Sequence, residues 1–313
     1  MIVNLIVKDN RLYIDMRYDT AVYSNHKVNK MKNEFKKNLI HITKLKEIEK
    51  LGDKLLLEVK AYNKNQKDIA TIINKDAKRD IYVFPPAMLK IAYIPLFESL
   101  FKRMPEYRFH IMHLLKIDDM DVEYYKYIKS QGECDNYTFM GYSGGANIAF
   151  DTALHMENES KTITHIIMID GFKWEEGTNY VTITKENIDE MIHNFITNSN
   201  IDIKILERPE ILSLLESDKE SFLKEANIYQ EYCYKHRDRT EVLNGCKITN
   251  LLSEDIISEP IDTRLSWRKS TSDEVEFIQG KGSHMSMLTE KGNLDLNSKI
   301  ISDMLSKGGK VGN

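Results

Sequence analysis

Cysteine is scarce in this chain of 313 residues, and Cys134, Cys233 and Cys246 lie far apart. An odd number of cysteines at these spacings makes neither a disulfide framework nor a metal site. The sequence therefore predicts a protein of a reducing compartment, with the cytoplasm as the default, and no metal ligands.

Long apolar runs and an excess of one charge are also lacking. The N-terminal stretch MIVNLIVKDNR is broken by Asn4 and Lys8, which leaves it too short for a signal-peptide core or a membrane span. The net charge is only −4 at pH 7, which gives no electrostatic reason to expect a nucleic-acid partner. We therefore expect neither a membrane nor a nucleic acid as partner.

Three segments differ in composition along the chain. Residues 1–46 indicate two strands over 2–18 followed by a helix, a piece too small to bury a core by itself. Residues 47–79 are charge-rich and predict a connector with one or two short helices. Over residues 80–313, short apolar runs alternate with helical stretches, which favours an α/β domain.

That alternation predicts a mostly parallel sheet with helices on both faces. Strands are expected at 81–84, about 107–115, 137–141, 163–169, 246–252 and 274–278, and helices at about 91–103, 121–131, 145–156 and 293–306. A largely helical, polar stretch at 174–240 interrupts this order, which predicts a lid inserted before the last strands.

Residues 141–145 read GYSGG and fit the G-x-S-x-G nucleophile elbow, where a serine projects from a sharp turn between a strand and a helix. Side chains in place of Gly141 and Gly145 would collide with the neighbouring strand and helix. We expect Ser143 to be a nucleophile and the Gly144 N–H, at the helix N-terminus, to donate to an oxyanion. The alternative is a turn that only packs a strand against a helix.

A nucleophilic serine needs a base, and in this architecture the histidine follows the serine along the chain. His284 lies in a glycine-containing loop just past the last expected strand, from which a side chain reaches the sheet edge. His236 lies in the charged stretch YKHRDR, which favours a solvated surface side chain. His284 is therefore the expected base.

The acid that would orient this base has two candidates. Asp170 ends the apolar strand ITHIIMID, whereas Asp255 follows the strand CKITNLL and is nearer to His284 in sequence. Either carboxylate is also typical of a helix cap or a loop. Spacing alone does not separate them.

Five motifs along residues 80–306 resemble, in order, those of the terminating thioesterase domains of nonribosomal peptide synthetases. They are YVFPP (82–86), GYSGGANIAF (141–150), HIIMIDGFK (165–173), Trp267 and GKGSHMSML (280–288). A tyrosine before the serine, here Tyr142, also resembles the terminating domains. Free-standing editing thioesterases usually have histidine at this position. Ala146 departs from the family, which often has a further glycine at this position.

The resemblance implies an α/β-hydrolase fold with a catalytic triad of Ser143, Asp170 and His284, because the family's acid follows the strand just after the elbow helix. It also implies that Ala87, just after the double proline, supplies a second oxyanion N–H beside that of Gly144. The acyl substrate of such domains is presented on the 4'-phosphopantetheine of an acyl or peptidyl carrier protein, with no cofactor bound covalently to the thioesterase.

Residues 1–46 resemble the closing strand-and-helix tail of a condensation domain, which implies that the chain is a remnant or an excised end of a larger synthetase. The stretch LGDKLL (51–56) is similar to a carrier's phosphopantetheine motif, but Lys54 stands where the acceptor serine would be. No cofactor attachment is expected there.

The sequence thus predicts a serine thioesterase of nonribosomal peptide antibiotic biosynthesis, which releases an acyl or peptidyl chain by hydrolysis or macrocyclisation. Two alternatives stay open: a general carboxylesterase or lipase of the same fold, and a catalytically silent docking module.

Overall fold

The chain divides into two compact units, residues 1–54 and residues 55–313. The structure, a computed structural model, describes residues 2–8, 11–17, 27–34, 37, 69–86, 90–115, 117, 119–132, 134–174, 184, 186, 188, 209–237, 239–255 and 264–308. In the first unit, β1 (Ile2–Lys8) and β2 (Arg11–Arg17) pair as an antiparallel hairpin. The two predicted N-terminal strands are confirmed. Lys54 lies outside the described residues.

The second unit is built on a seven-stranded sheet in the order β3-β5-β4-β6-β7-β8-β9. Only β3 runs antiparallel to its neighbour β5, and all other pairs are parallel. The strands are β3 (Ala70–Ile73), β4 (Arg79–Phe84), β5 (Tyr107–Met112), β6 (Tyr137–Tyr142), β7 (Ile163–Ile169), β8 (Lys247–Leu252) and β9 (Val275–Gln279). The predicted mostly parallel sheet is confirmed, with strand ends within a few residues of those expected.

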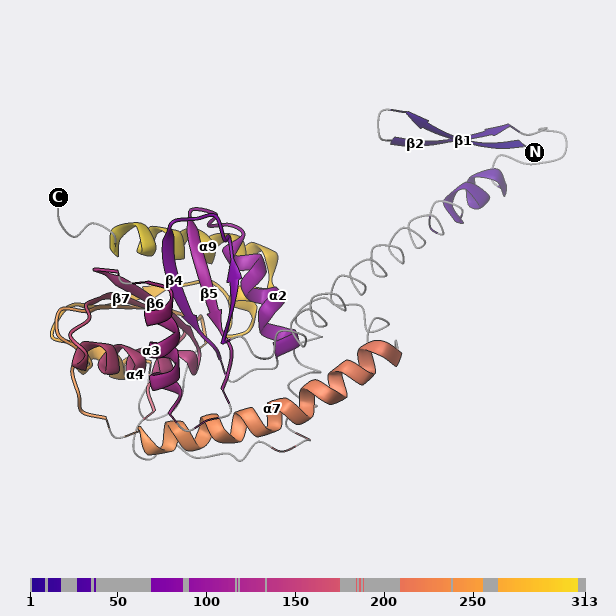
Figure 1. The fold of residues 1–313 in the computed structure, drawn as a ribbon. Coiled ribbons are helices and arrows are strands. Elements are labelled where there is room, and N and C mark those ends of the chain that lie inside the picture. Colours follow the sequence, from indigo (N-terminus) through magenta and orange to yellow (C-terminus); the bar gives the residue numbers. More distant parts are fainter. Residues whose placement is uncertain are drawn as a thin grey trace. The chain divides into compact units, whose positions relative to one another are not determined.

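Helices cover both faces of this sheet (Figure 1). They are α2 (Lys90–Phe101), α3 (Met120–Ser130), α4 (Gly145–Asn158), α7 (Pro209–Lys235), α8 (Ser286–Thr289) and α9 (Lys291–Gly308), with a short 3-10 helix at Ser266–Lys269. Within the described ranges, no helix is both long and apolar enough to cross a bilayer.

Alternate side chains of the central strands enter two separate cores. Phe84 and Phe139 pack with α3, α4 and α7, whereas Val83 and Met140 pack with α2, α8 and α9. Because both faces are covered, the strands read as nearly continuous apolar runs, for example ITHIIMI in β7.

Residues 70–73 differ from the expectation of a connector over 47–79. They form β3, which pairs antiparallel with β5 at the edge of the sheet, Ala70 opposite Met112. Four half-buried residues among charged neighbours are too short a run to stand out by periodicity.

In the expected lid, α7 is helical as predicted.

Candidate active site

Ser143 occupies the sharp turn between β6 and α4. Its φ of 54° lies in the left-handed region, which costs energy for a residue with a side chain. The turn is held in part by the Ser143 N–H, which donates to the Ile169 carbonyl of β7 at 2.9 Å. The serine is thereby presented at the carboxyl edge of the sheet, where the strained backbone of an elbow is expected.

Two glycines allow the close packing around this turn. A Cβ on Gly141 would lie 2.6 Å from the main-chain nitrogen of Ala146, at the start of α4. A Cβ on Gly145 would lie 2.5 Å from the carbonyl oxygen of Phe84, at the end of β4. Both obstacles are backbone atoms of packed elements, so neither position accommodates a side chain.

The structure brings Ser143, His284 and Asp170 into one hydrogen-bonded line. His284 Nε2 lies 3.1 Å from Ser143 Oγ, and His284 Nδ1 lies 2.6 Å from Asp170 Oδ2. The three side chains come from the ends of β6 and β7 and from the loop after β9. The carboxylate is buried, whereas the imidazole is one-third exposed (33%). One ring nitrogen can therefore face a substrate while the other is fixed.

The carboxylate of Asp170 is strongly engaged on both oxygens. Oδ1 accepts the main-chain N–H of Ser253 at 2.8 Å and lies 3.2 Å from Nη1 of the buried Arg264. Burial by itself would raise the pKa of Asp170, but the hydrogen bonds from His284 and Ser253 outweigh it and lower the pKa to about 2. The acid is therefore ionised at neutral pH.

Asp255, the other candidate acid, contacts His284 differently. Its Oδ2 accepts the main-chain N–H of His284 at 2.6 Å, whereas the ring is bound by Asp170. Spacing left the two carboxylates equivalent, and the structure places each on a separate group of the same histidine.

Tyr142 contacts His284 through both its hydroxyl and its ring. Its hydroxyl donates to the His284 carbonyl at 2.7 Å, and the two rings stack with centroids 5.0 Å apart. Burial raises the pKa of the Tyr142 phenol far above its usual range, so it stays a donor.

Sequence reasoning singled out Tyr142 only as a family feature. Arg264 was missed, because no motif marks a residue that meets Asp170 from 94 positions away.

Of the two expected oxyanion donors, Gly144 lies within the described residues. Gly144 is the N-cap of α4, so its N–H lies at the positive end of the helix dipole. Ala87 lies outside the described residues, although Pro85 and Pro86 before it follow directly on β4.

The interpretation of His236 as a solvated surface residue is wrong. Its ring is half-buried, with Nδ1 3.2 Å from Oδ2 of the buried Asp151 on α4. The charged sequence around His236 concealed this, because its partner lies 85 residues earlier.

A mostly parallel sheet with a serine at a strained strand-to-helix turn, hydrogen-bonded to a histidine, is the architecture of the α/β hydrolases. Within that class, the chain belongs to the thioesterase domain family, whose model matches residues 81–304.

Known relatives agree with this assignment. Surfactin synthase subunit 3 of Bacillus subtilis (strain 168) is 24% identical over 236 residues, which cover 75% of this chain but 17% of that protein. The solved thioesterase domain SrfTE, which cyclises the lipopeptide antibiotic surfactin, has a TM-score of 0.59 at 22% identity, covering 79% of this chain and 97% of the domain. The NocB thioesterase domain was solved as a covalent complex with a fluorophosphonate nocardicin G analogue. It has a TM-score of 0.53 at 15% identity, and the match covers 75% of this chain and 99% of the NocB domain.

These matches confirm the resemblance to thioesterase domains of nonribosomal peptide synthetases. The chain spans only a small part of the length of the synthase subunits that it matches.

Proposed function

We propose that this chain is a serine thioesterase that releases an acyl or peptidyl chain from the phosphopantetheine thiol of a carrier protein. The observation that carries the proposal is the line from Asp170 Oδ2 through His284 to Ser143 Oγ, with separations of 2.6 and 3.1 Å. This is the arrangement that lets an imidazole take a proton from a hydroxyl while a carboxylate fixes its tautomer.

In the first half-reaction, Ser143 Oγ attacks the thioester carbonyl carbon and its proton passes to His284 Nε2. Asp170 accepts the Nδ1–H and stabilises the imidazolium. The Gly144 N–H stabilises the tetrahedral oxyanion, and the resemblance assigns a second donor to Ala87; each such donor is worth about 3–4 kcal/mol in comparable sites. The C–S bond then breaks, and His284 returns its proton to the departing thiolate.

In the second half-reaction, water or a nucleophile of the acyl chain itself attacks the ester on Ser143. His284 takes the proton of this nucleophile and passes it to Ser143 Oγ as the ester bond breaks. Water gives a free acid, and an internal nucleophile gives a ring.

The carrier-presented substrate is proposed because the relatives are subunits of peptide synthases. The lid, residues 174–240, would shape the acyl pocket and admit the carrier arm.

Two tests separate this function from its rivals. A fluorophosphonate probe should label the protein but not Ser143→Ala, whereas a silent docking module would leave both unlabelled. A thioesterase should turn over acyl-pantetheine thioesters in preference to the matching oxygen esters. A carboxylesterase or lipase should show the opposite preference.

A further inference from the structure

Polar contacts join α4 and its N-cap to helix α7 of the lid, to the residues just after α7 and to the chain that enters the lid. The residues on the α4 side form a stripe of Gly144, Asn147 and Asp151, which follow each other at spacings of three and four residues and so lie on one side of the helix. Each of them contacts α7 or a segment that borders the lid. α4 is the helix that begins at the nucleophile turn.

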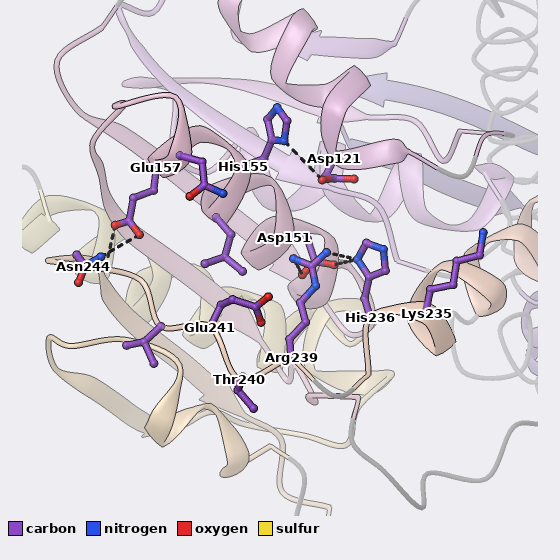
Figure 2. A pocket seen from close by; sticks show the side chains of 13 residues that line it. Asp121, Asp151, His155, Glu157, Lys235, His236, Arg239, Thr240, Glu241 and Asn244 are labelled. Carbon is purple, nitrogen blue, oxygen red and sulfur yellow. Dashed lines mark hydrogen bonds and ion pairs between the residues drawn. The ribbon is translucent and has the colours of Figure 1, made fainter.

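At the far end of the stripe, Asp151 holds the end of α7. Its carboxylate is buried, with Oδ1 2.8 Å from Nη1 of Arg239 and Oδ2 3.2 Å from Nδ1 of His236 (Figure 2). A buried carboxylate that lost these partners would be left uncompensated, which is strongly destabilising. The junction after α7 is therefore fixed to α4.

In the middle of the stripe, Asn147 fixes the chain where it enters the lid. Its Nδ2 donates to the Phe172 carbonyl at 2.9 Å, and its Oδ1 accepts the Trp174 N–H at 3.1 Å. One side chain thereby binds a carbonyl and an N–H of the segment that follows β7.

At the near end, the Tyr229 hydroxyl of α7 donates to the Gly144 carbonyl oxygen at 2.6 Å. The same oxygen also accepts from Asn147, whose main-chain nitrogen lies 3.1 Å away and whose Nδ2 lies 3.5 Å away. The Tyr229 ring is buried, and a Cβ on Gly144 would overlap its hydroxyl. Burial raises the pKa of the Tyr229 phenol well above its usual value, which keeps the hydroxyl a donor.

The contact acts on the residue expected to stabilise the oxyanion. The N–H and the C=O of Gly144 belong to the two peptide units on either side of its Cα. Glycine has no side chain to restrict those two dihedral angles, so hydrogen bonds to the two peptides decide the direction of the N–H. A donor is effective only when it is already aimed at the place where the oxygen becomes charged.

We propose that Tyr229 is a positioning residue, through which the lid helix α7 holds the Gly144 N–H in the direction that catalysis requires. The inference rests on the proposed function, since it assigns a role within that reaction. It makes the C-terminal half of α7 a fixed part of the active site.

The test is the rate at which a fluorophosphonate probe phosphonylates Ser143 in the whole chain, a reaction that forms a P–O bond and releases fluoride. Tyr229→Phe keeps the ring and removes only the hydroxyl. We expect labelling to be about five- to ten-fold slower, as for the loss of one buried hydrogen bond. The matched control is Tyr234→Phe, an exposed residue (51%) of the same helix, which should label within about twofold of wild type.

Thermal unfolding separates this role from a merely structural one, because labelling is measured well below the unfolding midpoint of every variant. Slow labelling by folded Tyr229→Phe supports the inference. Equal labelling of wild type and Tyr229→Phe overturns it, whatever the change in midpoint, and leaves the proposed function standing. No labelling of wild type overturns the proposed function and the inference together.

Discussion

The carboxylate of Asp255 accepts the main-chain N–H of His284 at 2.6 Å, while the ring of the same histidine is bound by Asp170. Two acids that spacing could not distinguish therefore have separable roles. Asp170 fixes the tautomer and the charge of the imidazole. Asp255 fixes the loop from which the imidazole projects.

Asp170→Asn is expected to lower kcat by roughly 10⁴-fold, because an amide facing Nδ1 favours the wrong tautomer and does not stabilise the imidazolium. Thioester turnover measured with a soluble acyl-pantetheine surrogate gives the comparison. A loss of only a few-fold would remove Asp170 from the proposed triad.

The Asp255 variants should behave differently from each other. Asp255→Asn keeps an oxygen acceptor for the His284 N–H, so kcat should fall by no more than about tenfold. Asp255→Ala removes the acceptor and should cost about 10- to 100-fold, with the protein still folded. If Asp255→Asn were as damaging as Asp170→Asn, the acid would have to be reassigned.

The stability of the protein should depend on pH through Asp170. Its pKa is lowered to about 2 in the folded state, below the value of about 3.9 in an unfolded chain. The stabilisation is therefore present above pH 4 and is lost as the pH falls through 2, and it amounts to about 2–3 kcal/mol. Denaturant unfolding of wild type and Asp170→Asn at pH 6, 4 and 3 should show the difference between them shrinking as the pH falls. A constant difference would contradict the origin assigned to the shift.

Gly145→Ala should destabilise the fold and abolish activity. The new Cβ would lie 2.5 Å from the Phe84 carbonyl oxygen and 2.9 Å from that of Pro85, both backbone atoms. Overpacking of this kind costs about 1–3 kcal/mol in the free energy of unfolding. The control is Gly292→Ala at the start of α9, where no atom lies within 4 Å of the new Cβ and stability should be kept or raised by up to about 1 kcal/mol. Equal behaviour of the two variants would contradict the packing described for the turn.

The fold could be predicted largely because most strands are nearly continuous apolar runs between turns and the helices are periodic. β7 was expected at 163–169 and lies at Ile163–Ile169, since ITHIIMI is a continuous apolar run between turns. β3 was missed because its four residues are stabilised by pairing with β5, whose paired residues lie 36 to 42 positions later and are not revealed by composition.

The same distinction divides the active site. Ser143 and His284 carry local signals, a glycine-flanked turn and a loop after the last strand. The choice between Asp170 and Asp255 depends on which carboxylate reaches the His284 ring. Asp170 lies 114 residues before His284 and Asp255 lies 29 residues before it, and this separation does not tell which of them contacts the ring. The Tyr229 contact likewise joins residues 85 positions apart, and nothing in the local sequence marks it.

The most direct test of the central claim is intact-protein mass spectrometry after mixing the chain with an acyl-pantetheine thioester, with thiol release followed in parallel. The account predicts an acyl adduct that maps to the peptide containing Ser143, with thiol released by wild type and neither adduct nor release with Ser143→Ala. Thiol release at the same rate by Ser143→Ala, or an acyl adduct on a different residue, would contradict it.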